Sequence, residues 1–217
     1  MRAIDLANYV VSKRIPGMNR LRLQLVMYYA YAEYPKWNLG RDELFEDDIR
    51  LFKLGPNIQD IHEGFQVWST KDLKEPIRRL DLETMQVVDY SDSLLTGIDR
   101  FYMDFILDAT KDLDVWSLVH LATSEPMYLH HKKAIDNGTF FGCYDKEWVR
   151  SYFSDIYLKE YLKQIEDSVT STYGEESKYV AIDVSGGSSL VWYCPSRAPL
   201  VNHVSKLGGN WKVARIE

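Results

Sequence analysis

Apolar residues near the start of the chain recur at helical spacing. Successive apolar positions lie three or four residues apart, which places them on one face of a helix. In the first predicted helix these positions are Ile4, Ala7 and Val11. In the second they are Leu21, Leu25, Tyr28 and Ala32. Asn19 precedes the second run and is a residue type that favours the N-cap position, so the pattern predicts a helix start there.

A short extended segment then leads to a glycine–proline corner. Gly55 can adopt a positive φ, Pro56 fixes its own φ, and Asn57 can cap a following helix. We therefore expect a turn at residues 54–57, with a helix directly after it. The apolar face of that helix would consist of Ile58, Ile61, Phe65 and Trp68.

Helical spacing continues through the middle of the chain. Asp92 and Asp114 are candidate N-caps of two further helices, and Pro126 is expected to end the second. The apolar positions of these helices are Leu94, Leu95, Ile98, Phe101, Tyr102, Phe105 and Ile106, then Trp116, Leu118 and Val119. A long amphipathic helix is indicated by Trp148, Tyr152, Ile156 and Leu162.

The pattern changes to that of strands near the C-terminus. Residues 178–184 and 189–194 flank the turn sequence Ser185-Gly186-Gly187-Ser188, which predicts a β-hairpin, and residues 211–216 predict a third strand. The polar, glycine-containing segment 132–142 is the expected domain boundary. The predicted fold is mainly α: a compact multi-helix domain at residues 1–137 and an α+β extension, a helix plus a small three-stranded sheet, at residues 138–217.

Composition and charge indicate a globular protein. Among 217 residues, 46% are hydrophobic and 27% are charged, which excludes a disordered chain. The net charge of −6 disfavours nonspecific binding to nucleic acid. The N-terminus has no signal-peptide pattern and no apolar run reaches membrane-spanning length, so we expect a cytoplasmic protein that does not contact a membrane.

Residue types that bind metals or cofactors are sparse. Cys143 and Cys194 form neither a disulfide framework nor a zinc motif. His130 and His131 are adjacent, so on a helix they point in different directions, and we interpret them as surface residues. Residues 185–189 lack the lysine of a phosphate-binding loop. We expect no metal and no cofactor.

A histidine and a carboxylate near residue 120 raise the question of catalysis. His120 and Glu125 could form an acid–base pair. The alternative is a histidine that packs within its helix, and we favour it. No catalytic residue is therefore predicted.

Two features are candidate contacts for a protein partner. The first is the acidic run Asp42, Glu43, Glu46, Asp47 and Asp48, which is either a solvated loop or a docking patch for a basic partner. The second is the pair Trp192 and Tyr193 in the predicted hairpin, which a strand places on opposite faces. One ring would be packed and the other available as an anchor. Alternatively, the extension only covers one side of the helical core.

Four segments in order resemble the Panacea domain over roughly residues 3–125. They are IDLANYVV, LQLVMYYA, the stretch from LF through GPNIQDIHEGF, and WSLVHLATSEP. The signature residues that carry the resemblance are Tyr28, Tyr29, Gly55, Pro56 and Asn57. The chain has Asn57 where the family usually has valine, and LQLV where a lysine often interrupts the leucines.

The resemblance implies an antitoxin or phage-associated protein that binds and neutralises a toxin by direct contact. Some members of the family act as adaptors that deliver a bound toxin to a protease, so sequestration and delivery both stay open. The alternatives are a phage-encoded inhibitor of a host defence protein and an enzyme of mobile-element origin. The implied partner is a protein, a toxin or another host or phage protein, and no direct contact with nucleic acid is implied. The oligomeric state stays open.

Overall fold

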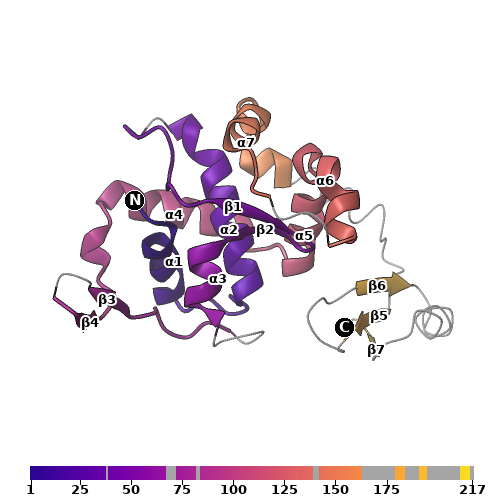
Figure 1. Ribbon diagram of the computed structural model, residues 1–217, viewed down its shortest axis with the longest axis horizontal. Coiled ribbons are helices and arrows are strands. Elements are labelled where there is room, and N and C mark those ends of the chain that lie inside the picture. The colour runs from indigo at the N-terminus through magenta and orange to yellow at the C-terminus, as the bar shows by residue number, and fades with distance from the viewer. Residues whose placement is uncertain are drawn as a thin grey trace. The chain divides into compact units, whose positions relative to one another are not determined.

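The chain divides into two compact units, Met1–Leu162 and Lys163–Glu217. The computed structural model describes residues 1–37, 39–66, 72–81, 84–138, 142–162, 179–183, 191–194 and 211–215 (Figure 1). The fold is mainly α with small antiparallel sheets, as the sequence predicts. The division falls after Leu162 and not after residue 137, because α7 (Lys146–Phe153) packs against α2 (Arg20–Glu33) within the first unit.

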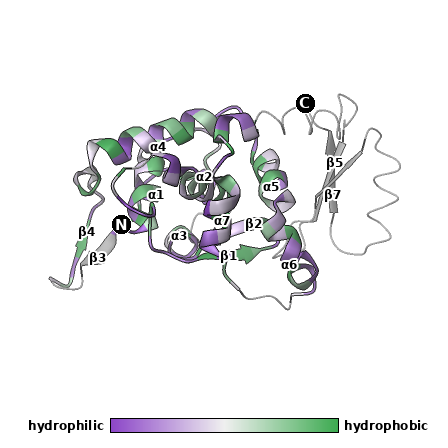
Figure 2. Ribbon diagram, turned by 90° about the horizontal axis from the view of Figure 1, so that it is seen from above, coloured by the Kyte–Doolittle hydropathy of each residue, from purple (hydrophilic) through white to green (hydrophobic). Residues whose placement is uncertain are grey.

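Helix α2 forms the centre of the first unit. It contacts α1 (Ala3–Ser12), α3 (Gln59–Gly64), α4 (Gly97–Thr110) and α5 (Val115–Ser124), and Figure 2 shows it among its neighbours. Every residue from Leu23 to Glu33 is buried. A helix that is buried on all sides needs no polar face, so its tyrosines pack inside the unit along with its leucines.

Helix starts follow local capping chemistry. The side chain of Asn19 accepts a hydrogen bond from the backbone N–H of Arg22, and Asp114 accepts two at the start of α5, so both predicted caps are confirmed. The cap of α4 is Thr96, whose side chain and that of Asp99 form a reciprocal capping box. The prediction that Asp92 caps this helix is wrong, since Asp92 lies in the 3-10 turn η3 (Asp92–Leu94).

The glycine–proline corner belongs to a hairpin. Strands β1 (Ile49–Phe52) and β2 (Gly55–Ile58) pair antiparallel with Phe52 opposite Gly55, so the turn is at residues 53–54. The predicted turn at 54–57 is therefore wrong in place, and Ile58, not Asn57, is the N-cap of α3. The side chain of Gln24 bonds both the N–H and the C=O of Ile58, at 2.7 and 3.1 Å, and so substitutes for a neighbouring strand. Helix α3 ends at Gly64, and Trp68 lies outside the described residues.

The segment after α5 differs from the prediction in two places. Pro126 is the first residue of α6 (Pro126–Asp136), because proline suits the first helical turn, so the expected boundary segment is partly helical. The long helix predicted from Trp148 to Leu162 is interrupted after α7, and residues 158–162 form a separate helical turn. The buried side chains of α7 are Val149 and Phe153. Residues 142–144 run antiparallel to β1, with the N–H of Tyr144 bonding the C=O of Ile49.

The remaining strands form two small sheets. Strands β3 (Arg79–Asp81) and β4 (Gln86–Val88) pair in the first unit. In the second unit, β6 (Val191–Cys194), β5 (Tyr179–Asp183) and β7 (Trp211–Arg215) form an antiparallel sheet in that order, which confirms the predicted strands. The turn predicted at 185–188 lies outside the described residues. Trp192 pairs with Ala181 and Tyr193 with Val180, and the side chains of this unit lie outside the described part.

Among the helices that the structure describes, none combines the length and the apolar composition needed to cross a bilayer.

Candidate functional site

A carboxyl group lies buried among tyrosines at the centre of the first unit. Glu125 connects α5 to α6 and is 0% exposed. The Tyr28 hydroxyl donates a short hydrogen bond to Oε2 of Glu125, and the Tyr29 hydroxyl donates to Oε1 at 3.3 Å. The ring of Tyr161 lies 6.4 Å from that of Tyr29, and its hydroxyl favours the charged form of the same carboxyl group. The cluster therefore joins α2, the α5–α6 connection and the helical turn at residues 158–162.

Aromatic rings enclose this carboxyl group. The ring of Tyr144 lies 5.3 Å from that of Tyr28, and the ring of Phe153 lies 6.4 Å from Tyr28 and 6.3 Å from Tyr29. Burial raises the pKa of Glu125 to about 8, although the tyrosine hydroxyls favour its charged form. Burial also raises the pKa of Tyr28 and of Tyr29 well above the ordinary value.

A raised carboxyl pKa is typical of a catalytic acid, yet here the geometry favours a structural role. A substrate would have to reach the carboxyl oxygens, and Glu125 is fully enclosed. Among the described residues, hydrogen bonds to this carboxyl group come from the hydroxyls of Tyr28 and Tyr29. Glu125 instead fixes the end of α5 against α2.

The signature residues meet in this same core. Tyr28 and Tyr29 are both 0% exposed, and Gly55 has φ +107°. A Cβ atom on Gly55 would lie 3.3 Å from Cβ of Ala122 in α5 and 3.5 Å from Cδ2 of Leu25 in α2. The glycine thus allows β2 to approach both helices. Pro56 and Asn57 are buried in β2, and the Asn57 amide lies 3.2 Å from Nδ1 of His62.

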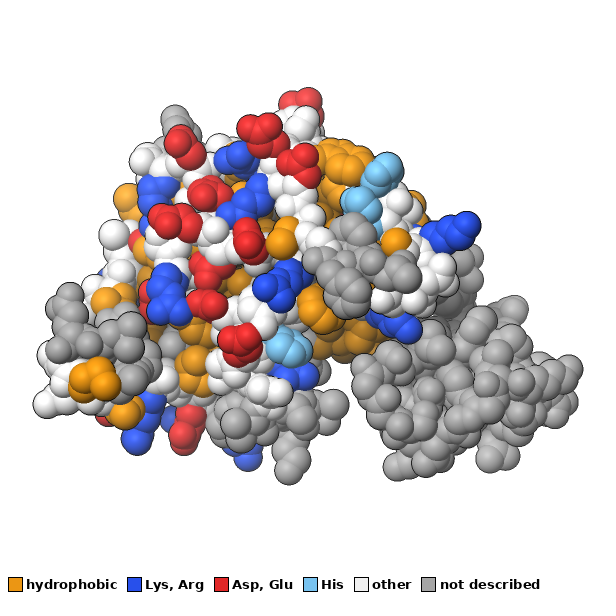
Figure 3. All heavy atoms as spheres, in the orientation of Figure 1, with side chains coloured by type: hydrophobic (Ala, Val, Ile, Leu, Met, Phe, Trp, Pro, Cys, Tyr) orange, Lys and Arg blue, Asp and Glu red, His pale blue; other side chains and the backbone are white. Residues whose placement is uncertain are grey.

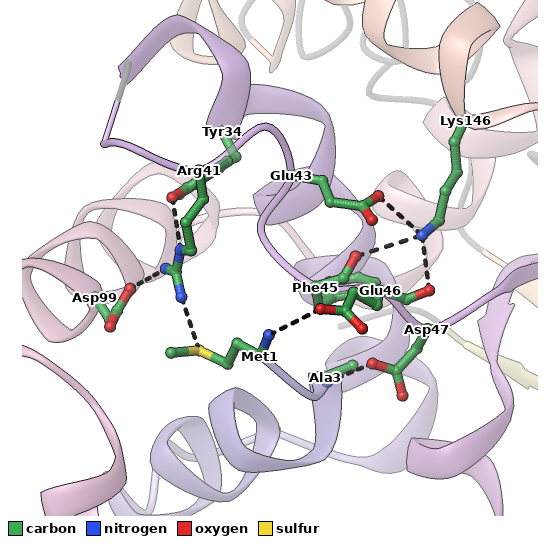
Figure 4. Close-up of polar contacts among 10 residues, drawn as sticks. All are labelled: Met1, Ala3, Tyr34, Arg41, Glu43, Phe45, Glu46, Asp47, Asp99 and Lys146. Carbon is green, nitrogen blue, oxygen red and sulfur yellow. Dashed lines mark hydrogen bonds and ion pairs between the residues drawn. The ribbon is translucent and has the colours of Figure 1, made fainter.

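Two carboxylates of the acidic run, Glu43 and Asp47, are built into the fold (Figure 4). Glu43 accepts hydrogen bonds from Tyr31 and Lys146, both at 3.0 Å. Burial acts to raise the pKa of Glu43, but these two hydrogen bonds help to outweigh it, and the pKa is lowered overall. Asp47 accepts from the backbone N–H of Ala3 at 2.8 Å, at the start of α1. Two of the five predicted docking carboxylates are therefore engaged inside the molecule.

The same loop ties distant elements together. Arg41 donates to the Tyr34 hydroxyl at 3.0 Å and forms an ion pair with Asp99 of α4 (Figure 4). The Lys146 amine also donates to the carbonyl of Glu46 at 2.9 Å, which anchors α7. The Glu46 side chain is nevertheless exposed, and its carboxylate lies 3.8 Å from the N-terminal amine. Asp42 and Asp48 are exposed as well, so they and Glu46 stay available to a partner.

An apolar stripe runs along the outer face of α4. On this face Ile98 is 57% exposed and Phe101 is 65% exposed. The half-buried ring of Trp37 lies 6.1 Å from Phe101 and 4.8 Å from Phe105. We call Ile98, Phe101 and Phe105 the α4 stripe. The apolar positions of α4 describe two faces, and Tyr102 and Ile106 occupy the buried one.

Charges elsewhere on the first unit are mixed. Figure 3 shows acidic and basic side chains interleaved over much of one face. Such a face differs from the one-signed basic stripe that is typical of a nucleic-acid interface. Among the described residues, no group of three or more His, Cys, Asp or Glu side chains could hold a metal ion. The rings of His130 and His131 are 4.7 Å apart, and His130 also contacts Trp148.

Comparisons with protein-family models, curated proteins and solved structures found no match. The resemblance to the Panacea domain therefore stays a prediction from the sequence.

Proposed function

We propose that this protein binds and neutralises a protein partner by direct contact, as an antitoxin-like or phage-associated protein. The observation that carries the proposal is the α4 stripe. Most large rings of the first unit are buried, yet Phe101 is 65% exposed and lies beside Ile98, which is 57% exposed. Contiguous exposed apolar side chains mark interaction surfaces, and buried aromatic anchors dominate the binding energy of protein interfaces.

The exposed part of the acidic run supports a basic partner. Asp42, Glu46 and Asp48 face solvent, and the chain carries a net charge of −6. Charges at the rim of an interface chiefly accelerate association, while buried rings slow dissociation. The exposed carboxylates of the acidic run should therefore chiefly affect the association rate, and the α4 stripe the dissociation rate. Trp192 and Tyr193 of the second unit stay candidate contacts that select the partner.

Two modes of neutralisation follow from this binding. The partner can be sequestered in a stable complex, or it can be carried to a protease complex and degraded. The level of the partner in cells separates them. Sequestration leaves it unchanged when this protein is expressed, whereas delivery lowers it.

Co-purification from the native host tests the binding. The full-length protein is tagged, and proteins recovered with it are identified by mass spectrometry for the wild type and for Ile98→Asp and Phe101→Asp. Leu129→Asp is the matched control, because Leu129 is 51% exposed on α6 and lies outside the stripe. Circular dichroism checks that all variants fold.

We expect one partner to be recovered with the wild type and Leu129→Asp and lost with both stripe variants. Recovery of the same partner with all four proteins would refute the role of the stripe. Expression of the recovered partner alone should arrest growth, and the wild type should relieve the arrest. A harmless partner would contradict the antitoxin-like function while leaving the binding intact.

A further inference from the structure

Residues 142–162 form the part of the first unit that covers the tyrosine cluster. Tyr144 and Phe153 of this segment pack against Tyr28, and the ring of Tyr161 lies 6.4 Å from that of Tyr29. The segment therefore packs against the two tyrosines of α2 that bond the buried carboxyl group of Glu125. If the segment moved away, Glu125 would gain access to water.

The other polar contacts that hold residues 142–162 involve ion pairs, in which each charge has a partner of opposite sign. Lys146 pairs with Glu43 at 3.0 Å. Lys36 pairs with Glu33 at 2.5 Å and donates to the carbonyl of Ile156, while Glu33 also accepts from the N–H of Leu158 at 3.2 Å. In each case a cation meets the carboxylate, so these anchors hold while both groups are charged.

Glu125 differs because, among the described residues, the titratable side chains that act on its carboxyl group are tyrosines. Helix α2 contributes Tyr28 and Tyr29, and the strand-like residues 142–144 contribute Tyr144. Tyr152 of α7 and Tyr161 of the helical turn complete the set. Among the described residues, the side chains that act on this carboxyl group include no cation. A negative charge here would be buried without a counter-charge, which is costly.

We propose that residues 142–162 are a pH-sensitive clasp that closes over α2 when Glu125 is protonated and opens more readily when Glu125 is ionised. Opening releases the proton to solvent and lets water hydrate the carboxylate. Closing requires that the proton be taken up again. The two states differ in the contacts of this segment, while the rest of the unit stays folded.

The sign and the range of the effect follow from linkage. Burial raises the pKa of Glu125 to about 8 in the closed state, and the ordinary value, 4.5, applies to the hydrated carboxyl group. Closure is therefore fully favoured below about pH 4.5, weakens as pH rises and levels off above about pH 8. Between about pH 5 and pH 8, the opening equilibrium should rise by a factor on the order of 10² to 10³.

Hydrogen exchange on the full chain tests the clasp. Exchange is followed by mass spectrometry from about pH 5 to about pH 9 and corrected for the intrinsic rate at each pH. We expect the protection of residues 146–162 to fall at least 100-fold up to about pH 8 and then to level off. The protection of α4 should change far less.

Variants separate the clasp from a general loss of stability. Glu125→Gln should remove the pH dependence of residues 146–162. Glu147→Gln, at an exposed site on α7, should keep the wild-type profile. Protection that does not vary with pH in the wild type, or an unchanged pH profile in Glu125→Gln, would overturn the proposal. If Glu125→Gln does not fold, Tyr161→Phe takes its place, and the pH dependence of its protection is compared with that of the wild type. The loss of a hydroxyl that favours the ionised form should move the plateau to higher pH, and an unmoved plateau would overturn the proposal.

Discussion

Replacing Gly55 with alanine should destabilise the first unit through two separable effects. The φ of +107° lies beyond the left-handed helical region that other residues occasionally adopt, which costs about 1–3 kcal/mol for a residue with a Cβ atom. The added Cβ would also lie 3.3 Å from Cβ of Ala122, closer than ordinary contact. Because β2 is fixed against α2 and α5, neither strain relaxes easily. We expect Gly55→Ala to lower the free energy of unfolding by about 2–3 kcal/mol.

Two other glycines provide matched controls. Gly40 has φ +78°, and a Cβ atom added there would have no heavy atom within 4 Å, so Gly40→Ala isolates backbone strain at about 1 kcal/mol. Gly97, at the start of α4, also has nothing within 4 Å, and alanine there should be neutral or stabilising by up to about 1 kcal/mol. Urea unfolding followed by circular dichroism ranks the three variants. A Gly55→Ala midpoint equal to that of Gly97→Ala would refute the reasoning.

Three further predictions concern the ties within the first unit. Asp47→Ala should lower the free energy of unfolding by about 1 kcal/mol, because the N–H of Ala3 loses its acceptor, whereas the exposed Asp48→Ala should change it by less than about 0.5 kcal/mol; equal urea midpoints would contradict this. Asp99→Ala should cost about 1–3 kcal/mol in thermal unfolding, since the capping box of α4 and the ion pair with Arg41 are both lost, and an unchanged melting temperature would count against these roles. A chain ending at Leu162 should unfold cooperatively, whereas one ending at residue 137 should not, because it uncovers the Tyr28 side of α2; circular dichroism melts compare the two, and a cooperative melt of the shorter chain would be the contrary result.

The features predicted correctly from sequence depend on near neighbours in the chain. Asn19 and Asp114 cap their helices by accepting hydrogen bonds from backbone N–H groups two or three residues away, so the cap and its donors are visible together in the sequence. The residues of β5 and β6 have the alternating pattern of strands and flank a glycine-containing sequence, which is again a local signal. The placement of these elements needed no knowledge of the rest of the fold.

The features that were missed depend on partners far along the chain. Gln24 bonds Ile58 and thereby draws Gly55 to Asn57 into a strand, against their turn propensity. Lys146 is 103 residues from Glu43, so the sequence around the acidic run does not reveal the hydrogen bond between them. The tyrosine pair and Glu125 were each singled out by sequence, yet only the fold brings them together across 97 residues.

Crosslinking in living cells tests the proposed protein binding most directly. A photoreactive phenylalanine analogue replaces Phe101 in the α4 stripe, or Lys133 on the exposed side of α6 as the control, in the full-length protein. Irradiation in the native host should yield a crosslinked partner from position 101 and much less from position 133, and mass spectrometry identifies it. A position 101 that crosslinks no protein, or no more than position 133, would contradict the proposal that the α4 stripe binds a partner.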